Sequence, residues 1–190
     1  CGTLKSQEDK NQVLIPIGKQ VQGGTDAVLV VDPLCPACAA FHKRILETQY
    51  AAKMNFKLAV LPLDNECNWM MTDSMHPGSC VLAKAMVCAK DKAEELLEWS
   101  YSNLKDFRPK DKADNPSGRI KEAVVKAFPQ VRDCLDSPDT KIALNKSLNW
   151  AVEQSLPVLT PQLYVNGRRL CDEDTDLGLD YAMGRLLGTK

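Results

Sequence analysis

The chain has 190 residues, 44% of them hydrophobic, which is enough for one domain of moderate size with a buried core. Its formal charge is -1, from 24 basic and 25 acidic residues, so it lacks the charge excess typical of proteins that bind nucleic acid or anionic membranes. The apolar run 27–31 is far shorter than the roughly 20 residues that cross a bilayer.

Eight cysteines are present, and their even number is typical of a disulfide framework in an oxidising compartment. We therefore expect an extracytoplasmic, periplasmic location; the alternative is a reducing compartment with buried free thiols, which pack as small hydrophobes. No signal peptide is recognisable, so we expect a mature form or an excised domain.

Residues 1–22 begin with the polar, aperiodic stretch CGTLKSQEDKNQ and predict a tether or linker. In one interpretation, Cys1, followed by Gly2, is the lipid-bearing first residue of a mature lipoprotein. A domain cut from a longer membrane protein is the other interpretation, and the choice stays open. The folded domain is expected over residues 23–190.

The first predicted elements are a strand, a helix and a second strand. Segment 27–31 is a short β-branched run, as expected for a strand buried on both faces, and Asp32 ends it. A helical pattern starts at Pro36, a residue suited to the first turn, and places Cys38 on an apolar stripe. Segment 56–61 predicts the second strand.

From about residue 67 to 156 the sequence pattern is typical of helices rather than strands. The predicted helices are 81–101, 120–128 and 140–156. A hairpin follows, in which Asn166-Gly167 joins Gln162–Val165 to segment 168–171, and a last helix runs from the acidic residues 174–176 to Leu187. This order predicts an α/β layer structure that is interrupted by a helical insertion between the second strand and the C-terminal hairpin.

The Cys-Pro-Ala-Cys sequence predicts a redox pair. Cys35 falls at the start of the predicted helix, where unpaired amides and the positive end of the helix dipole favour a thiolate. Cys38 lies on the apolar face one turn later, within reach of a disulfide. We therefore expect Cys35 to be the nucleophile and Cys38 the buried resolving thiol.

Two other interpretations of the pair are a zinc site and a structural disulfide. Zinc requires four ligands, usually from a second Cys-x-x-Cys or a histidine pair, and the sequence offers neither, so no metal is expected. A structural disulfide can arise by chance in a cysteine-rich chain, and only the wider sequence context argues against it.

That context is a family resemblance. DPLCPACAAFHK, the helical insertion and LTPQLYVNGRRL resemble the DsbA-like branch of the thioredoxin superfamily. LPLDNECNWMMTDSMHPGSC and the later VCAKD are similar to DsbA-like domains that occur beside, or fused to, bacterial vitamin K epoxide reductase homologues. The resemblance covers nearly the whole chain beyond the tether and implies a thioredoxin-like fold.

The resemblance also implies the rest of the site. Pro161 is expected to follow a cis peptide bond beside Cys35, and Thr160 to present its backbone to an extended substrate. An ordinary trans proline at the start of a strand is the alternative. The other residues expected to contact substrate are Leu34, Pro36 and Ala37.

The sequence departs from the family pattern at three positions. Leu159 replaces the glycine common before Thr160, and Ala37 stands where strongly oxidising relatives have histidine, so we expect a milder oxidant. The buried acid of thioredoxins falls near Leu29, and the nearest acid, Asp32, is interpreted as structural.

Four further cysteines are expected to form two structural disulfides. Cys80 and Cys88 lie too far apart along one helix to bond with each other. We favour Cys67–Cys80 with Cys88–Cys134, and the pairing 67–88 with 80–134 remains open. Cys171 has only Cys1 as a partner or is free.

The histidines and methionines carry weaker signals. His42 is expected to pack or to face solvent, with proton transfer as the alternative, and His76 is interpreted as a turn residue. A cluster of Trp69, Met70, Met71 and Met75 suits a groove for varied substrates, although core packing is the simpler interpretation.

The sequence thus predicts a monomeric thiol-disulfide oxidoreductase that oxidises reduced or unfolded proteins and needs no dissociable cofactor. Its expected second partner is a membrane quinone reductase of the vitamin K epoxide reductase or DsbB type. The alternatives are a disulfide reductase or isomerase, although no dimerisation segment is evident, and a non-redox, chaperone-like binding domain.

Overall fold

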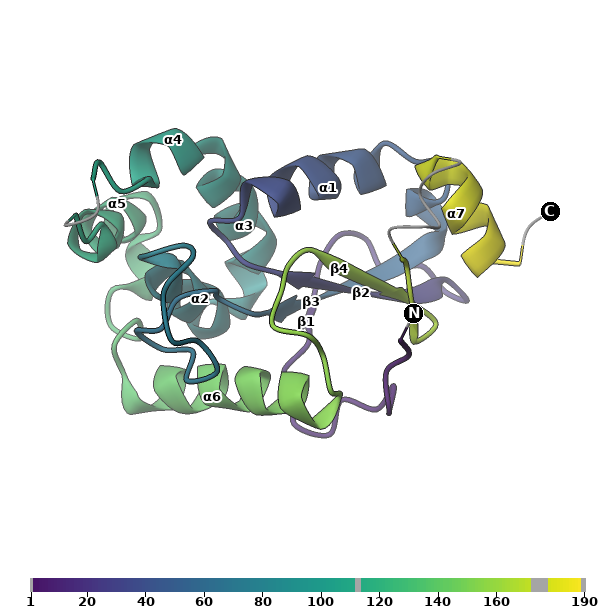
Figure 1. Cartoon of the computed structure of the whole chain (residues 1–190), viewed down its shortest axis with the longest axis horizontal. Coiled ribbons are helices and arrows are strands. Elements are labelled where there is room, and N and C mark those ends of the chain that lie inside the picture. The colour runs from purple at the N-terminus through teal and green to yellow at the C-terminus, as the bar shows by residue number, and fades with distance from the viewer. Residues whose placement is uncertain (1, 112–113, 172–177, 189–190) are drawn as a thin grey trace.

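A computed structural model describes residues 2–111, 114–171 and 178–188, and shows a five-stranded sheet with helices on both faces (Figure 1). The strands are β1 (Ile15–Pro16), β2 (Thr25–Val31), β3 (Met54–Val60), β4 (Gln162–Val165) and β5 (Arg168–Arg169). The helices are α1 (Pro36–Leu46), α2 (Ser79–Cys88), α3 (Ala93–Ser102), α4 (Leu104–Phe107), α5 (Ser117–Ala127), α6 (Pro138–Glu153) and α7 (Leu179–Leu186). Short 3₁₀ turns occupy Ala51–Lys53, Lys90–Lys92 and Pro129–Val131.

The strand order is β1-β3-β2-β4-β5, so β2 lies at the centre of the sheet. β2 and β3 are parallel and are joined by α1, whereas β4 runs antiparallel to β2 and continues through the predicted hairpin into β5. Asn166 and Gly167 both have positive φ angles, as the tight hairpin turn requires. This arrangement confirms the predicted α/β fold.

The two faces of β2 face different helices because successive side chains point to opposite sides of a strand. Ala27, Leu29 and Val31 belong to the core that also contains residues of α1, α2, α3 and α7. Val28 and Val30 pack with residues of α6 on the other face. The continuous apolar run therefore reflects a strand that is covered on both sides (Figure 1).

The helices α2 to α5 lie at one end of the sheet, between β3 and β4 in the chain (Figure 1). α2 is almost wholly buried and contacts α3, α5 and α6. Two disulfides, Cys67–Cys80 and Cys88–Cys134, hold this part of the chain, each with its Cα atoms 5.8 Å apart. This is the pairing that the sequence analysis favours.

The prediction of a tether over residues 1–22 is wrong. Ile15–Pro16 forms the edge strand β1, antiparallel to β3, and Thr3 makes an isolated bridge to Arg168. Val13, Ile15 and Ile17 are all buried, so the segment carries the period-two pattern of a strand with one buried face. The N-terminal segment is part of the folded domain.

Two helix predictions also differ from the structure. The single helix predicted over 81–101 is divided at Ala89, which leaves the helical region with φ -119° and ψ 68°. The last helix begins at Leu179, and the acidic residues predicted to start it lie outside the described residues. Across the described part of the chain, no helix combines the length and apolar character needed to cross a membrane.

Candidate active site

Cys35 lies between the end of β2 and the start of α1, at the N-cap position of the helix. Its backbone amide donates to the carbonyl oxygen of Asp32 at 3.1 Å. Its Sγ accepts a hydrogen bond from the backbone amide of Cys38 at 3.2 Å, and Pro36 occupies the first helical turn. The Cys35 sulfur therefore meets one of the unpaired amides at the positive end of the helix dipole.

The two sulfurs are free thiols and differ strongly in acidity. A hydrogen bond from the Cys38 thiol is the largest influence on Cys35 and, with smaller contributions from Thr160, the Cys38 amide and the charge of His76, lowers its pKa to about 6 despite burial. Burial, together with the neighbouring Cys35, raises the pKa of Cys38 far above its ordinary value. At neutral pH the pair is therefore a thiolate at Cys35 beside a protonated thiol at Cys38.

The chain segment before β4 lies against Cys35. The Thr160-Pro161 peptide bond is cis, as predicted, and the carbonyl oxygen of Thr160 lies 3.7 Å from the Cys35 Sγ, which donates to it in its thiol form. Gln162 is buried and holds this segment, because its side-chain amide donates to the carbonyl oxygens of Pro157 and Leu159 at 3.0 and 2.6 Å. No motif in the sequence indicates this role of Gln162.

The remaining predicted contact residues surround the pair. Pro36 and Ala37 are exposed at the start of α1, whereas the Leu34 side chain is buried. A pocket of about 380 Å³ opens beside them. It is lined by Leu34, Pro36, Met75, His76, Pro77, Leu104, Phe107, Arg108 and Pro109.

His76 is not simply a turn residue, as the sequence suggested. Its Nδ1 lies 3.0 Å from the Oδ2 of Asp32, which is fully buried. Asp32 is structural, as interpreted, because its carboxylate accepts from the backbone amides of Leu34 and Leu63, both at 2.6 Å. Asp32 also contacts His76, and no local sequence signal indicates that contact.

His42, one turn after Cys38 on α1, is buried and packs near the ring of Tyr101, with ring centroids 6.0 Å apart. Neither ring nitrogen has a hydrogen-bond partner in the described structure, and burial lowers the pKa of His42. Of the predicted roles, the structure supports packing. His42 is therefore a neutral core residue.

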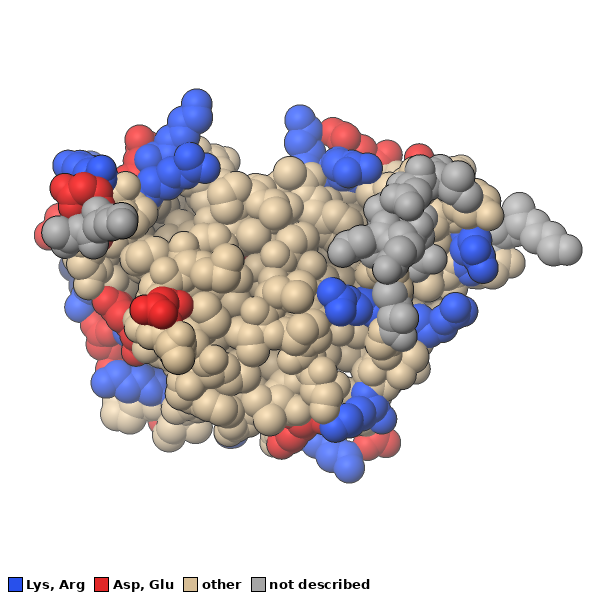
Figure 2. Space-filling model, viewed as in Figure 1, with Lys and Arg blue, Asp and Glu red and all other residues tan. Residues whose placement is uncertain are grey.

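The surface around the pair carries few charges. Figure 2 shows an extended face without Lys, Arg, Asp or Glu over the middle of the molecule, between the amino end of α1, the segment before β4 and α6. Trp69 and Met75 are 58% and 66% exposed, so these two members of the predicted cluster are not core residues. Met70, in contrast, packs against the core on the α6 side.

The described residues contain no cluster of His, Cys, Asp or Glu that could hold a metal ion. Cys171 takes part in a disulfide, and Cys1, the partner considered for it, lies outside the described residues. The sheet, the thiolate at a helix N-terminus and the cis proline facing it define a class, the thioredoxin-like thiol-disulfide oxidoreductases.

The chain belongs to the thioredoxin family, since a family model described as thioredoxin matches residues 18–182. Among solved structures it is similar to oxidised BdbD from Bacillus subtilis, with 14% identity and a TM-score of 0.60 over 98% of this chain and 95% of that one. DsbA from Xylella fastidiosa is 19% identical, with a TM-score of 0.57 over 90% of both chains. A linker-deletion variant of ScsC from Proteus mirabilis is 18% identical, with a TM-score of 0.59 over 93% of this chain and 75% of that one.

These similarities show a DsbA-like fold. No curated protein sequence matches the chain at a significant level.

Proposed function

We propose that the chain oxidises pairs of cysteines in reduced proteins outside the cytoplasm, with Cys35 and Cys38 as the catalytic pair. The observation that carries this proposal is the stabilised Cys35 thiolate, whose pKa is lowered to about 6. Stabilising the reduced pair makes its disulfide a stronger oxidant, because the disulfide gains more free energy when it is reduced. The eight cysteines, four of them in two structural disulfides, support an oxidising compartment.

The reaction starts from the Cys35–Cys38 disulfide. A substrate thiolate attacks the Cys35 sulfur, the Cys35–Cys38 bond breaks, and Cys38 leaves and takes up a proton, as its raised pKa favours. A second substrate thiolate then attacks the substrate sulfur of the mixed disulfide and releases Cys35 as a thiolate. Two substrate thiols are oxidised to one disulfide, and the catalytic pair is reduced by two electrons.

Substrate binding is assigned to residues around Cys35. The backbone of Thr160 pairs with an extended substrate segment, while Pro161, Leu34, Pro36 and Ala37 contact its side chains. Exposure of Pro36 and Ala37 and the small number of charges on the surrounding face support contacts with varied partners (Figure 2).

The pair must be reoxidised after each turnover. We assign this step to a membrane quinone reductase of the vitamin K epoxide reductase or DsbB type, which takes two electrons from the dithiol and passes them to a quinone. The resemblance of the segment around Cys67 and Cys80 to domains associated with vitamin K epoxide reductase homologues supports the first type. Mixing the reduced chain with such a reductase and a quinone in vesicles should regenerate the Cys35–Cys38 disulfide; no disulfide above that formed with quinone alone would contradict this partner.

The function is tested with the oxidised protein and a peptide that contains two cysteines. We expect stoichiometric conversion of the peptide to its disulfide, and complete loss of this activity in Cys35→Ser and in Cys38→Ser, because neither variant can form the Cys35–Cys38 disulfide. Reduced Cys38→Ser, mixed instead with the oxidised peptide, should accumulate a mixed disulfide at Cys35, because no Cys38 thiol is present to resolve it. A double Cys88→Ser/Cys134→Ser variant is the matched control and should retain oxidation, because it removes two cysteines away from the site. Oxidation that survives in Cys35→Ser, or a wild-type protein that reduces protein disulfides but oxidises no peptide, would overturn the proposal.

A further inference from the structure

Of the chain's two histidines, His76 lines the pocket beside the candidate active site, whereas His42 is buried in the core. The His76 imidazole is 18% exposed, whereas the Asp32 carboxylate beside it is completely buried. A buried carboxylate is stable when its charge is balanced and its oxygens are hydrogen-bonded. Asp32 has two backbone amide donors, and His76 Nδ1, 3.0 Å from its Oδ2, is the third partner and the one that can carry a balancing charge.

The acidic partner favours the charged form of His76. Burial lowers the pKa of His76, but the hydrogen bond and the charge of Asp32, with smaller effects from Cys35 and Asp64, raise it above its ordinary value overall. His76 also lies beside the reactive thiol, because it lines the same pocket as Pro36, the residue that follows Cys35. The influence is therefore reciprocal, and the charge of His76 lowers the pKa of Cys35.

Four charged or titratable groups face His76 from the elements packed around it. Asp32 ends β2, Cys35 begins α1, and Asp64 lies in the segment after β3. Arg108, after α4, lines the same pocket as His76. The two carboxylates outweigh the single arginine in favouring a positive imidazolium.

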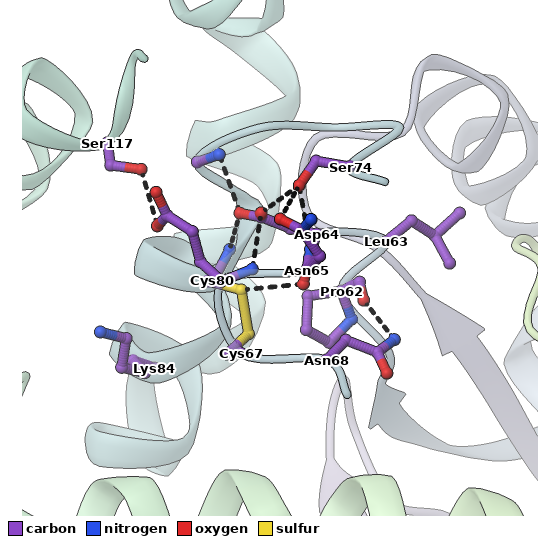
Figure 3. Close-up of a disulfide and its surroundings, with 12 residues drawn as sticks. Pro62, Leu63, Asp64, Asn65, Cys67, Asn68, Ser74, Cys80, Lys84 and Ser117 are labelled. Carbon is purple, nitrogen blue, oxygen red and sulfur yellow. Dashed lines mark hydrogen bonds between the residues drawn. A yellow bond between two sulfur atoms is a disulfide. The ribbon is translucent and has the colours of Figure 1, made fainter. Parts of the chain in front are cut away.

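The loop that carries His76 is fixed in place. The backbone amides of Met75 and His76 both donate to the carbonyl oxygen of Leu63, at 2.9 and 3.0 Å. The buried Asp64 carboxylate binds both ends of the loop (Figure 3). Its donors are Ser74 Oγ at 2.7 Å and the amides of Gly78 and Cys80 at 2.9 and 3.2 Å.

The Cys67–Cys80 disulfide closes the same loop beside Asp64 (Figure 3). The His76 ring is therefore held by three independent constraints: the Asp32 contact, the backbone bonds to Leu63 and the closed loop. A side chain held in this way places its charge without the entropy cost of ordering it in each catalytic cycle.

We propose that His76 is a positioning residue for the oxidoreductase reaction, whose imidazolium, held by Asp32, stabilises the Cys35 thiolate from outside the Cys-Pro-Ala-Cys sequence. It thereby supplies part of the stabilisation that a histidine at position 37 would give. Asp32 acts through His76, and neither residue touches the reacting sulfurs in a covalent step. The inference deepens the proposed function and rests on Cys35 being the reactive thiol.

The test compares the pKa of Cys35 in reduced wild-type protein and in His76→Gln, measured from the pH dependence of the thiolate ultraviolet absorbance. Loss of one neighbouring positive charge should raise this pKa by about 0.5 to 1 unit. The equilibrium with glutathione should then become about three- to tenfold less oxidising. His42→Gln is the matched control and should leave the Cys35 pKa unchanged.

His76→Lys separates charge from shape. If the charge is what matters, lysine at position 76 restores a Cys35 pKa closer to the wild-type value than glutamine does, whereas a purely structural role is disturbed by both changes. An unchanged Cys35 pKa in a folded His76→Gln protein, or an equal rise in the lysine and glutamine variants, would overturn the proposal. Because the readout is the thiolate itself, a wild-type protein that fails to oxidise peptides contradicts only the proposed function.

Discussion

At the scale of single residues, the candidate site depends on two cysteines, Cys35 and Cys38, that lie about one helical turn apart. Both are buried, but Cys35 caps α1 and its Sγ meets the backbone amide of Cys38. The hydrogen bond from Cys38 lowers the pKa of Cys35, whereas burial and the neighbouring Cys35 raise the pKa of Cys38. The proposed attack at Cys35 and departure of Cys38 both depend on this difference in pKa.

Cys38 should contribute to the reactivity of Cys35 even before any disulfide forms. Its thiol donates the hydrogen bond that most lowers the Cys35 pKa, so Cys38→Ala should raise that pKa above about 6. In wild-type protein the alkylation rate of Cys35 should rise through about pH 6 and then level off.

The measurement is the rate of iodoacetamide alkylation against pH, with the modified residue located by mass spectrometry. In Cys38→Ala the midpoint should move to higher pH. An identical midpoint in the two proteins would show that the hydrogen bond from Cys38 does not set the acidity of Cys35.

Some site residues could be predicted from the sequence because their signals are local. Cys35 and Cys38 share a helix start, and the Thr160-Pro161 pair stands directly before a strand. His76 and Asp32 lie 44 residues apart, and their contact depends on how the segment between β3 and α2 folds back over the end of β2. No sequence period or short motif encodes that contact, so His76 was interpreted only as a turn residue.

At the scale of elements, the strands of the central sheet were predicted well because both faces of β2 are covered and its apolar run is continuous. The edge strand was missed because its signal is short. Buried residues alternate with less buried ones only from Val13 to Ile17, after a long polar start. The predicted helix is divided at Ala89, and no glycine or proline stands there to indicate the break in the sequence.

The N-terminal edge strand should contribute to stability, in contrast to a tether. Ile15 is 1% exposed, so Ile15→Ala should lower the free energy of unfolding by about 2 to 4 kcal/mol, through lost burial and the cavity left behind. Urea unfolding measures this change, and Lys10→Ala, at an exposed position of the same segment, serves as the control. Equal stability of the two variants would restore the tether interpretation.

The two structural disulfides should differ in their contribution to stability. In the chain-entropy account, Cys67–Cys80, with a separation of 13 residues, contributes about 3 kcal/mol, and Cys88–Cys134, with a separation of 46, contributes about 4 kcal/mol. Paired serine substitutions, compared by urea unfolding with the catalytic pair kept reduced, test this order. A larger loss from the 67–80 pair would mean that local contacts around Asp64, rather than loop closure, determine the effect.

At the scale of the whole molecule, the proposed catalytic pair lies on a face with few charges, beside a pocket with largely apolar walls (Figure 2). Such a surface gives little charge-based discrimination between partners, which suits an enzyme that acts on many partly folded chains. The redox pair and the stability of the whole domain are thermodynamically linked, because the folded protein lowers the Cys35 pKa.

The reduced protein should therefore gain stability relative to the oxidised protein as pH rises. The Cys35 pKa is lowered from 9.0 to about 6 in the folded state, so its contribution is complete above about pH 9 and is lost as pH falls through about 6. Urea unfolding of both redox forms at several pH values checks this expectation. A difference between the two forms that does not change between pH 5 and pH 8 would contradict the Cys35 assignment.

The most direct test of the oxidase assignment is a glutathione redox titration of the Cys35/Cys38 pair. The Cys35 thiolate is stabilised in part by His76, but Ala37 stands where strongly oxidising relatives have a histidine. The lowered Cys35 pKa therefore predicts an intermediate potential. We expect it well above the roughly -270 mV of thioredoxin and below the roughly -120 mV of DsbA. A potential at or below that of thioredoxin would make the pair a reductant and contradict the account.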